Sequence, residues 1–570
     1  MSLRVGLSVL AAFLIGLYVL FQIATRPPEA PQHQVFINGN VLTMDSDNSV
    51  VQAISVRGDR IESLGSSEEI LALVEDNTEV TDLRGRTLMP GIVDAHGHFP
   101  GSGQKLFSAD LNSPPIGDVE NMEQMLGKLK ALADSQSEGW VSGFGYDDTM
   151  MAEGRHPTRD DLDKISKDRP VAIIHISGHL AVANTAALAE LGIDENTPDP
   201  EGGVIQRDPN SPDGTRPNGI LEETAARLVL MKRLDLGVTE GIRMTTYAAR
   251  EYLGVGVTTA SAGGMPLGLA RLLGPLSRFN VFPQRVALFP MMEEVEEAVL
   301  DGVWRPEEIE AGRVVAPRVK IIADGSIQGY TGYLSEPYYT PFHADPGYSG
   351  YPSVSREDLF RQVEGLHRQK VRYAIHTNGD AAVQDALDAI EAAQASVPWP
   401  EARPLFIHAQ MAREDQVKRM AELGVTPSFF SSHTYYWGDR HAAIFMGPER
   451  AANMSPAQWA LQNGVRYSSH ADTPVTPMLP MQVVWSQINR QTTSGAILGP
   501  DQRVSPMQAL RAVTIDAAWQ VFMDEEVGSI EPGKLADLII LSDDPTEVSD
   551  VRELVVERTF IGGAEVYSRR

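Results

Sequence analysis

Histidines at the ends of strand-like segments are the residues of this sequence best suited to bind a metal ion. His96 and His98 form an HxH pair at the end of the apolar stretch 87–96. Side chains two residues apart on an extended chain point to the same side, so both imidazoles can reach one cation. His376 and His408 each end a later apolar segment. One such histidine is often a hydrogen-bonded core residue, but four of them together predict a metal site.

A carboxylate and a lysine in two other strand-like segments could complete this site. Asp472 follows such a segment and could bind a metal and accept a proton from water, although Asp before Thr-Pro also suits a turn or a helix N-cap. Lys320 lies within an apolar stretch, where burial favours its neutral amine. That amine could react with carbon dioxide to give a carbamate that bridges two cations. Alternatively, Lys320 could pair with Asp324 or Asp94, and the spacing leaves both interpretations open.

Alternating strand-like and helix-like stretches predict the scaffold that positions these residues. Such alternation is typical of parallel βαβ units. The strand-like stretches are 87–96, 255–261, 281–289, 318–324, 372–377, 404–409, 425–431 and 465–472. Eight of them predict an α/β fold, a (β/α)8 TIM barrel over residues 87–524, whose active face lies at the C-terminal strand ends. A Gly/Pro/Asp-rich stretch at about 105–215 is expected to be an inserted subdomain.

The two ends of the folded chain are both rich in short β-strand signals. In residues 35–86, β-branched runs are broken by hairpin signals such as Asn38-Gly39. Residues 525–570 carry similar runs around Gly562-Gly563. We therefore expect both ends to pair into one small β-sandwich.

The first 26 residues contain an uncharged apolar run of twenty residues, Val5–Ala24. As a helix rising about 1.5 Å per residue, this run would span the roughly 30 Å hydrocarbon core of a bilayer. We expect an N-terminal transmembrane anchor, or else a cleaved signal. The protein would then touch the membrane through this helix only. Its catalytic part would be membrane-anchored or secreted, outside the cytoplasm, and periplasmic if the chain is bacterial.

Composition excludes several kinds of site and partner. The formal net charge of −28 over 570 residues argues against nucleic acid as a partner. The chain has no cysteine, which excludes a thiol nucleophile, thiolate ligands and disulfides. Any metal must therefore be held by nitrogen and oxygen ligands.

The sequence resembles the amidohydrolase superfamily, specifically the family-3 branch that includes N-substituted formamide deformylases. The matching stretches are PGIVDAHGH, GHLAVANTAAL, EGGVIQRD, PNGILEETA, VKIIADGS, IHTNGDAAV, FIHAQ, HADTPV and VGSIEPGKLADLIIL, spread over almost all of residues 35–570. The resemblance implies the barrel with a small β-sandwich. It also implies Lys320 as a carboxylated bridging lysine and a set of metal ligands that consists of His96, His98, His376, His408 and Asp472.

Three further residues are candidates for substrate binding. His179 lies in the matching stretch GHLAVANTAAL and Glu223 in PNGILEETA, and His433 follows the seventh strand-like segment. A purely structural role is the alternative for each. HADTPV departs from the family pattern, because His470 and Ala471 stand where small residues and serine are more usual, which puts the surroundings of the ligands in doubt.

These observations together predict a metal-dependent hydrolase. One or two divalent ions are expected, most naturally zinc, with manganese or iron as alternatives. The expected reaction is hydrolysis of a non-peptide C–N bond, in a small-molecule amide, N-acyl or N-formyl substrate. The alternatives are a lactone, ester or phosphotriester hydrolase that uses the same site, and a non-catalytic binding or regulatory relative. The oligomeric state is left open.

Overall fold

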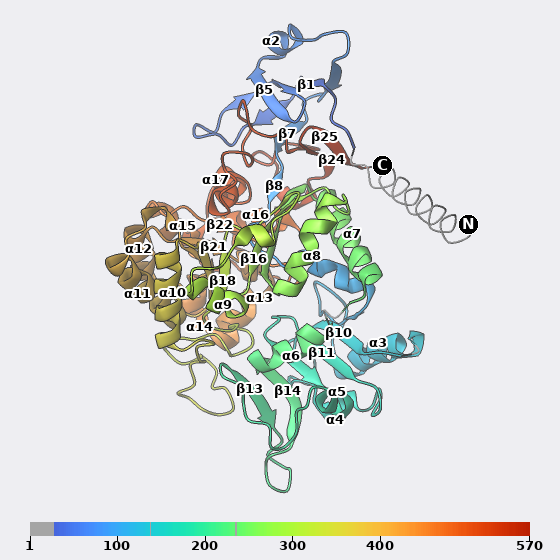
Figure 1. Ribbon diagram of the computed structural model, residues 1–570, viewed down its shortest axis with the longest axis vertical. Helices are drawn as coiled ribbons and strands as arrows, with labels where there is room; N and C mark the ends of the chain where they lie inside the picture. The colour runs from blue at the N-terminus through green and yellow to red at the C-terminus, as the bar shows by residue number, and fades with distance from the viewer. Residues whose placement is uncertain (1–27, 137, 234–235, 570) are drawn as a thin grey trace, which may run out of the picture.

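The computed structural model describes residues 28–136, 138–233 and 236–569 (Figure 1). The apolar run 5–24, expected to be an anchor or signal, lies outside these residues. Among the helices that are described, none is long and apolar enough to cross a membrane.

Two parallel sheets form the centre of the fold. Their strand orders are β17-β16-β15-β8 and β18-β19-β20-β21-β22. The strands are β8 (Ile92–Val93), β15 (Val257–Met265), β16 (Arg285–Pro290), β17 (Val314–Val315), β18 (Val319–Ile322), β19 (Tyr373–Thr377), β20 (Leu405–His408), β21 (Thr426–Phe429) and β22 (Ser468–Ser469). Each of the eight strand-like stretches of the sequence thus contains an observed strand, and β17 is additional.

Contacts at both edges link these two sheets. On one side, a parallel bridge joins Met291, just after β16, to Lys320 in β18. On the other side, the segment 512–513 lies between β22 and β8, because Ser469 N–H donates to the carbonyl of Ala512 and Val93 N–H donates to that of Val513.

Amphipathic helices cover the central strands and bury their apolar faces against them. These helices include α7 (Val238–Gly254), α8 (Leu267–Arg278), α9 (Met292–Leu300), α10 (Arg356–Gln369), α11 (Asp380–Ser396), α12 (Glu414–Leu423) and α16 (Pro480–Asn489). For example, Val363 and Leu366 of α10 belong to the same buried cluster as Ile375 of β19 and Ile390 of α11.

The two ends of the chain pair with each other at the top of Figure 1. One sheet has the order β5-β4-β1-β6, and the other has the order β25-β24-β23-β7-β2-β3. Their strands are β1 (His33–Ile37), β2 (Asn40–Leu42), β3 (Val50–Val51), β4 (Ala53–Arg57), β5 (Arg60–Gly65), β6 (Glu79–Asp82), β7 (Thr87–Pro90), β23 (Leu538–Leu541), β24 (Val556–Ile561) and β25 (Ala564–Ser568). Phe36, Leu88, Leu538 and Phe560 share one buried cluster.

The structure divides the first predicted central strand in two. Thr87–Pro90 forms β7, which pairs with β23 in the terminal sheet, and only Ile92–Val93 joins the central strands. The chain changes sheets at Gly91, whose N–H donates to the Asp537 carbonyl. A Cβ at Gly91 would lie 2.2 Å from the Thr258 hydroxyl, so only glycine allows this close approach.

A six-stranded sheet of order β13-β14-β12-β11-β10-β9 lies on the opposite side of the central strands (Figure 1). Its strands are β9 (Ala109–Asp110), β10 (Val141–Tyr146), β11 (Val171–His175), β12 (Leu180–Ala183), β13 (Gly203–Arg207) and β14 (Pro217–Glu223), accompanied by α3 (Met122–Ser135), α4 (Arg159–Leu162), α5 (Thr185–Glu190) and α6 (Thr224–Arg233). The sheet buries a separate apolar cluster on each face. Its last strand ends at Glu223, beyond the expected limit of about 215.

Candidate metal centre

Residues that follow β8 and β22 meet at one point. His98 Nε2 lies 3.2 Å from Asp472 Oδ1, and His96 Nε2 lies 3.5 Å from the same oxygen. His408, the last residue of β20, places its Nε2 3.9 Å from Asp472 Oδ2. The ligand atoms of His96, His98 and Asp472 all lie within 4.8 Å of one another. Three predicted ligands are therefore close enough to share a small cation, and His408 reaches the other oxygen of the same carboxylate.

Several buried atoms of this group have no hydrogen-bond partner among the described residues. They are His96 Nδ1, His376 Nδ1 and Asp472 Oδ1. His98 Nδ1 lies 2.6 Å from the carbonyl of Gly263, to which its N–H can donate, and this leaves Nε2 free to bind a metal. Buried polar atoms normally find partners, and imidazole nitrogen with carboxylate oxygen is a suitable ligand set for zinc. The residues present thus fit a divalent ion.

The backbone of two ligands is strained. His408 has φ +71° and Asp472 has φ +54°, and Glu223 from the inserted sheet has φ +50°. Residues other than glycine adopt this left-handed region at a cost of about 1–3 kcal/mol, and such strain is concentrated at functional sites. The strain is consistent with selection for side-chain placement at these positions.

Charge and burial set the protonation of the ligands. Burial raises the pKa of Asp472, but the adjacent His98 imidazole and the nearby Lys320 amine outweigh this and lower it to about 2. Burial lowers the pKa values of His96, His376 and His408 well below the ordinary value. The site therefore combines one carboxylate anion with neutral imidazoles, which are the metal-binding forms of both groups.

Lys320 lies directly against this cluster. Its Nζ is 2.9 Å from His96 Nε2, and the side chain is fully buried. Burial lowers its pKa to about 8. No ion pair among the described residues joins Lys320 to Asp94 or Asp324, which were its alternative partners. Asp324 instead accepts backbone N–H groups, for example those of Asn378 and Gly379 at 2.8 and 2.7 Å.

His376, at the end of β19, lies at the side of this group. Its ring centroid is 4.7 Å from that of His408 and 5.0 Å from that of His179. His179 Nδ1 in turn lies 2.8 Å from Glu223 Oε2. The inserted sheet thereby brings two predicted substrate-binding residues to the edge of the metal centre.

His433 lies one aromatic ring away from the ligands. It begins α13 (His433–Arg440), and its Nδ1 is 3.1 Å from His441 Nε2 and 3.3 Å from Gln410 Nε2. The ring of Phe430 contacts both His433 and His470, with centroids 4.4 and 5.3 Å apart. The structure therefore places His433 in the wall of the site.

His470 is a member of the site that the sequence did not identify as a ligand. Its Nε2 lies 3.1 Å from His408 Nδ1, and its ligand atoms group with those of His408 and Asp472. Its Nδ1 contacts the Ser428 hydroxyl at 2.8 Å. The available signal was the HxD spacing with Asp472, which repeats the i, i+2 spacing of His96 and His98.

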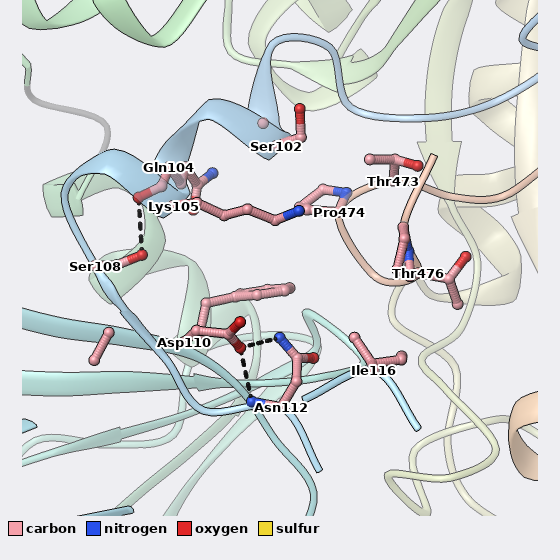
Figure 2. Close-up of a pocket in the computed structure, with 14 residues that line it drawn as sticks. Ser102, Gln104, Lys105, Ser108, Asp110, Asn112, Ile116, Thr473, Pro474 and Thr476 are labelled. Atoms are coloured by element: carbon pink, nitrogen blue, oxygen red, sulfur yellow. Dashed lines mark hydrogen bonds between the residues drawn. The ribbon is translucent and has the colours of Figure 1, made fainter. Parts of the chain in front are cut away.

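A pocket adjoins the segments that carry His98 and Asp472 (Figure 2). Its wall combines polar and apolar groups from three elements, including Ser102, Lys105, Asp110, Asn112, Ile116, Thr473, Pro474 and Thr476. Asp110 Oδ1 accepts hydrogen bonds from the backbone and side-chain amides of Asn112. This mixture could hold a small molecule with both polar and apolar parts.

Comparisons with known proteins agree with this geometry. A model described as "Amidohydrolase family" matches residues 79–567. The N-substituted formamide deformylase of Arthrobacter pascens is 30% identical over 559 residues, which cover 94% of this chain and 98% of that protein. Crystal structures of uncharacterized metal-dependent hydrolases from Pyrococcus horikoshii and Pyrococcus furiosus align with TM-scores of 0.72 and 0.69 at 26% identity, covering 91% and 90% of this chain and 99% and 100% of theirs.

Proposed function

Because the chain belongs to the amidohydrolase family, we propose that it hydrolyses a non-peptide C–N bond in a small amide, N-acyl or N-formyl compound. The observation that carries this proposal is the approach of His96, His98 and His408 to the carboxylate of Asp472, whose Oδ1 has no hydrogen-bond partner among the described residues. The similarity to a formamide deformylase supports the amide class of substrate.

We infer that the two central sheets close into the (β/α)8 barrel, with β17 as an additional short strand, and that the paired chain ends form the β-sandwich. The bridges on both sides of the two central sheets support closure. A barrel would gather the C-terminal ends of β8, β18, β19, β20 and β22 on one face, as the active site requires.

We propose one or two zinc ions, held by His96, His98, His376, His408 and Asp472. Such an ion polarises the scissile carbonyl and lowers the pKa of water from 15.7 towards about 7. Lys320 is buried, and its lowered pKa favours the neutral amine. In our proposal its Nζ attacks the carbon of carbon dioxide and loses a proton, which gives a carbamate whose oxygens can bind the metal.

Asp472 would move the proton during hydrolysis. Held as an anion beside His98, it accepts a proton from the water whose oxygen bonds to the carbonyl carbon. It then donates that proton to the nitrogen as the C–N bond breaks, so that the amine leaves neutral. His179, held by Glu223, is placed to contact the substrate from the inserted sheet, and His433 shapes the wall.

We also propose that the catalytic part lies outside the cytoplasm, anchored by or released from the apolar run Val5–Ala24. Fractionation of cells that express the full chain with a C-terminal tag tests this. Recovery of the tag in the cytoplasmic fraction alone would exclude both forms.

The catalytic proposal is tested with the full chain, purified in mild detergent without chelators. We expect one or two zinc ions per chain at the proposed ligands and turnover of N-substituted formamides, N-acyl amines or cyclic amides. Lactones, esters and phosphotriesters form the comparison panel. Faster turnover of that panel would replace the amide assignment, and no turnover by the zinc-loaded protein in either panel would favour a non-catalytic relative.

A further inference from the structure

A second group of metal-ligand side chains lies in the inserted sheet, apart from the proposed catalytic ligands. Asp148 and His156 lie in the loop that follows β10, and His175 is the last residue of β11. Strands β10 and β11 are parallel neighbours, and Tyr146 pairs with His175 in register. The two strands therefore hold His175 and the start of the loop that carries Asp148 side by side at their C-terminal ends.

The carboxylate of Asp148 stands between the two imidazoles. His175 Nε2 lies 3.3 Å from Asp148 Oδ1, and His156 Nε2 lies 3.6 Å from Asp148 Oδ2. Two ligands at about 2.0–2.1 Å from a tetrahedral zinc ion are roughly 3.4 Å apart. Both separations are close to that value, and Asp148 and His175 belong, with Asp147, to a group whose ligand atoms all lie within 4.8 Å of one another. His156 is outside that group, so its ring would turn towards the ion to become the third ligand.

Unpartnered buried atoms point into this space. His175 is completely buried, and neither its Nε2 nor Asp148 Oδ1 has a hydrogen-bond partner in the part of the chain that the structure describes. Asp148 and His156 are only partly buried, which leaves a route for an ion from solvent. A buried imidazole nitrogen aimed at an unpartnered carboxylate oxygen is expected where an ion completes the site.

Hydroxyl groups hold the far side of both rings. His175 Nδ1 lies 2.8 Å from Ser177 Oγ, and His156 Nδ1 lies 3.2 Å from the Tyr146 hydroxyl. Each hydroxyl can accept the Nδ1–H, which leaves the Nε2 lone pair for a metal, as is usual for metal-binding histidines. The rival arrangement is a metal-free His–Asp–His bridge, in which the Ser177 backbone N–H donates to His175 Nδ1 at 3.2 Å and Nε2 carries the proton.

The neighbouring Asp147 has a different role. Its Oδ1 accepts from the amide and hydroxyl of Thr149, and its Oδ2 accepts from Trp437 Nε1 at 3.0 Å and Arg440 Nη1 at 2.8 Å. Its Oδ1 thus stabilises the loop itself, and its Oδ2 holds the loop against α13, the helix that begins with His433. An ion that holds Asp148 in place would therefore also stabilise the contact between Asp147 and α13, which lies in the wall of the proposed catalytic site.

We propose that Asp148, His156 and His175 form a second site for a zinc-class divalent cation, with its fourth position open to water. The ion fastens loop 147–158 to the C-terminal end of β11 in the inserted sheet and so stabilises the contact of this loop with α13. This inference does not rest on the proposed hydrolase activity.

Zinc counting on the full chain tests the proposal. We load the protein with zinc alone, remove free ion and measure zinc per chain by elemental analysis. The variants are His175→Gln and Asp148→Asn, and the matched control is His343→Gln, which removes an exposed histidine on a nearby loop. We expect both site variants to lose one equivalent while the control loses none. Equal zinc content in wild type and both site variants would establish the metal-free bridge, and an equal loss in the control would show surface binding.

Two further measurements guard against misfolding and separate the two metal sites. Tyr146→Phe keeps all three ligands, so it should retain the equivalent at saturating zinc but bind it about 10–100-fold more weakly. Hydrogen exchange of residues 147–158 should slow on adding zinc in wild type but not in His175→Gln; no change in wild type would refute the fastening role. Zinc that remains in His175→Gln belongs to the catalytic ligands, so failure of one site leaves the other measurable.

Discussion

Replacing Gly263 with alanine should damage the metal centre although no ligand is substituted. Gly263 lies in β15 beside His96, and a Cβ there would be 2.2 Å from His96 Cε1 and 2.5 Å from His96 Nδ1. Real Cβ contacts essentially never fall below 3.0 Å, so the ring or the strand must move by roughly 1 Å. His96 is completely buried and Lys320 lies against its other nitrogen, which leaves the ring little room to retreat.

A displacement of this size has a defined cost. A 1 Å misplacement of a catalytic group can lower the rate about 10²-fold, and overpacking destabilises a protein by about 1–3 kcal/mol. We therefore expect Gly263→Ala to lose about 10² in kcat/KM on the best amide of the panel, with weaker zinc retention. The control is Gly268→Ala in α8, where a Cβ meets nothing within 4 Å and alanine favours the helix by about 0.5–1 kcal/mol. Unchanged zinc content and activity in Gly263→Ala would refute the claim that the added Cβ displaces His96 and that the position of His96 matters for zinc binding and turnover.

Four further predictions concern the other contacts described above. Asp472→Asn should lower turnover about 10²–10⁴-fold while zinc is retained, and near-native turnover would remove its proton-transfer role. His179→Ala should lower kcat/KM about 10²-fold, and an unchanged value would leave this residue a purely structural role. Arg440→Leu leaves the buried Asp147 carboxylate short of its charge partner and should cost about 3 kcal/mol in urea unfolding; a cost below about 1 kcal/mol would contradict the buried pair. Asp161→Asn should cost about 1–3 kcal/mol near neutral pH. Hydrogen bonds with Arg155, Lys164 and Thr158 outweigh burial and hold the pKa of Asp161 below its usual range. The stabilisation by Asp161 is therefore present above the unfolded pKa of about 3.9 and is lost as the pH falls below it. If the difference in free energy of unfolding between Asp161→Asn and wild type does not shrink below about pH 4, this reasoning is refuted.

Local patterns were sufficient to locate the elements of the centre and most of the candidate ligands. Apolar runs located eight of the central strands, because strands buried on both faces are continuous apolar runs bounded by polar residues. The HxH pair and the histidines at the C-terminal ends of β19 and β20 needed only the rule that the ends of parallel strands share a face. The family resemblance is confirmed by the family model and by the formamide deformylase relative.

Features that depend on distant parts of the chain were not predictable in this way. The division of 87–96 between β7 and β8 depends on pairing with β23, more than 400 residues away in sequence. The role of His470 depends on the position of His408. Asp148 and His175 are brought together only by the register of β10 and β11, and nothing in their spacing indicates a shared ion.

The inserted sheet takes part in the site rather than only covering it. It supplies His179 and the strained Glu223 at the edge of the metal centre, and through Asp147 it holds the helix that begins with His433. A change that loosens the sheet should therefore alter substrate binding before it alters metal binding, since none of the proposed catalytic ligands comes from it. An ion at the second cation site would act on the sheet and α13 but not on the segments that carry the catalytic ligands. Its effect should therefore also be on substrate binding and not on binding of the catalytic metal. Zinc binding at the second site should then lower KM more than it raises kcat, and an effect on kcat alone would show that the sheet acts on the ligands themselves.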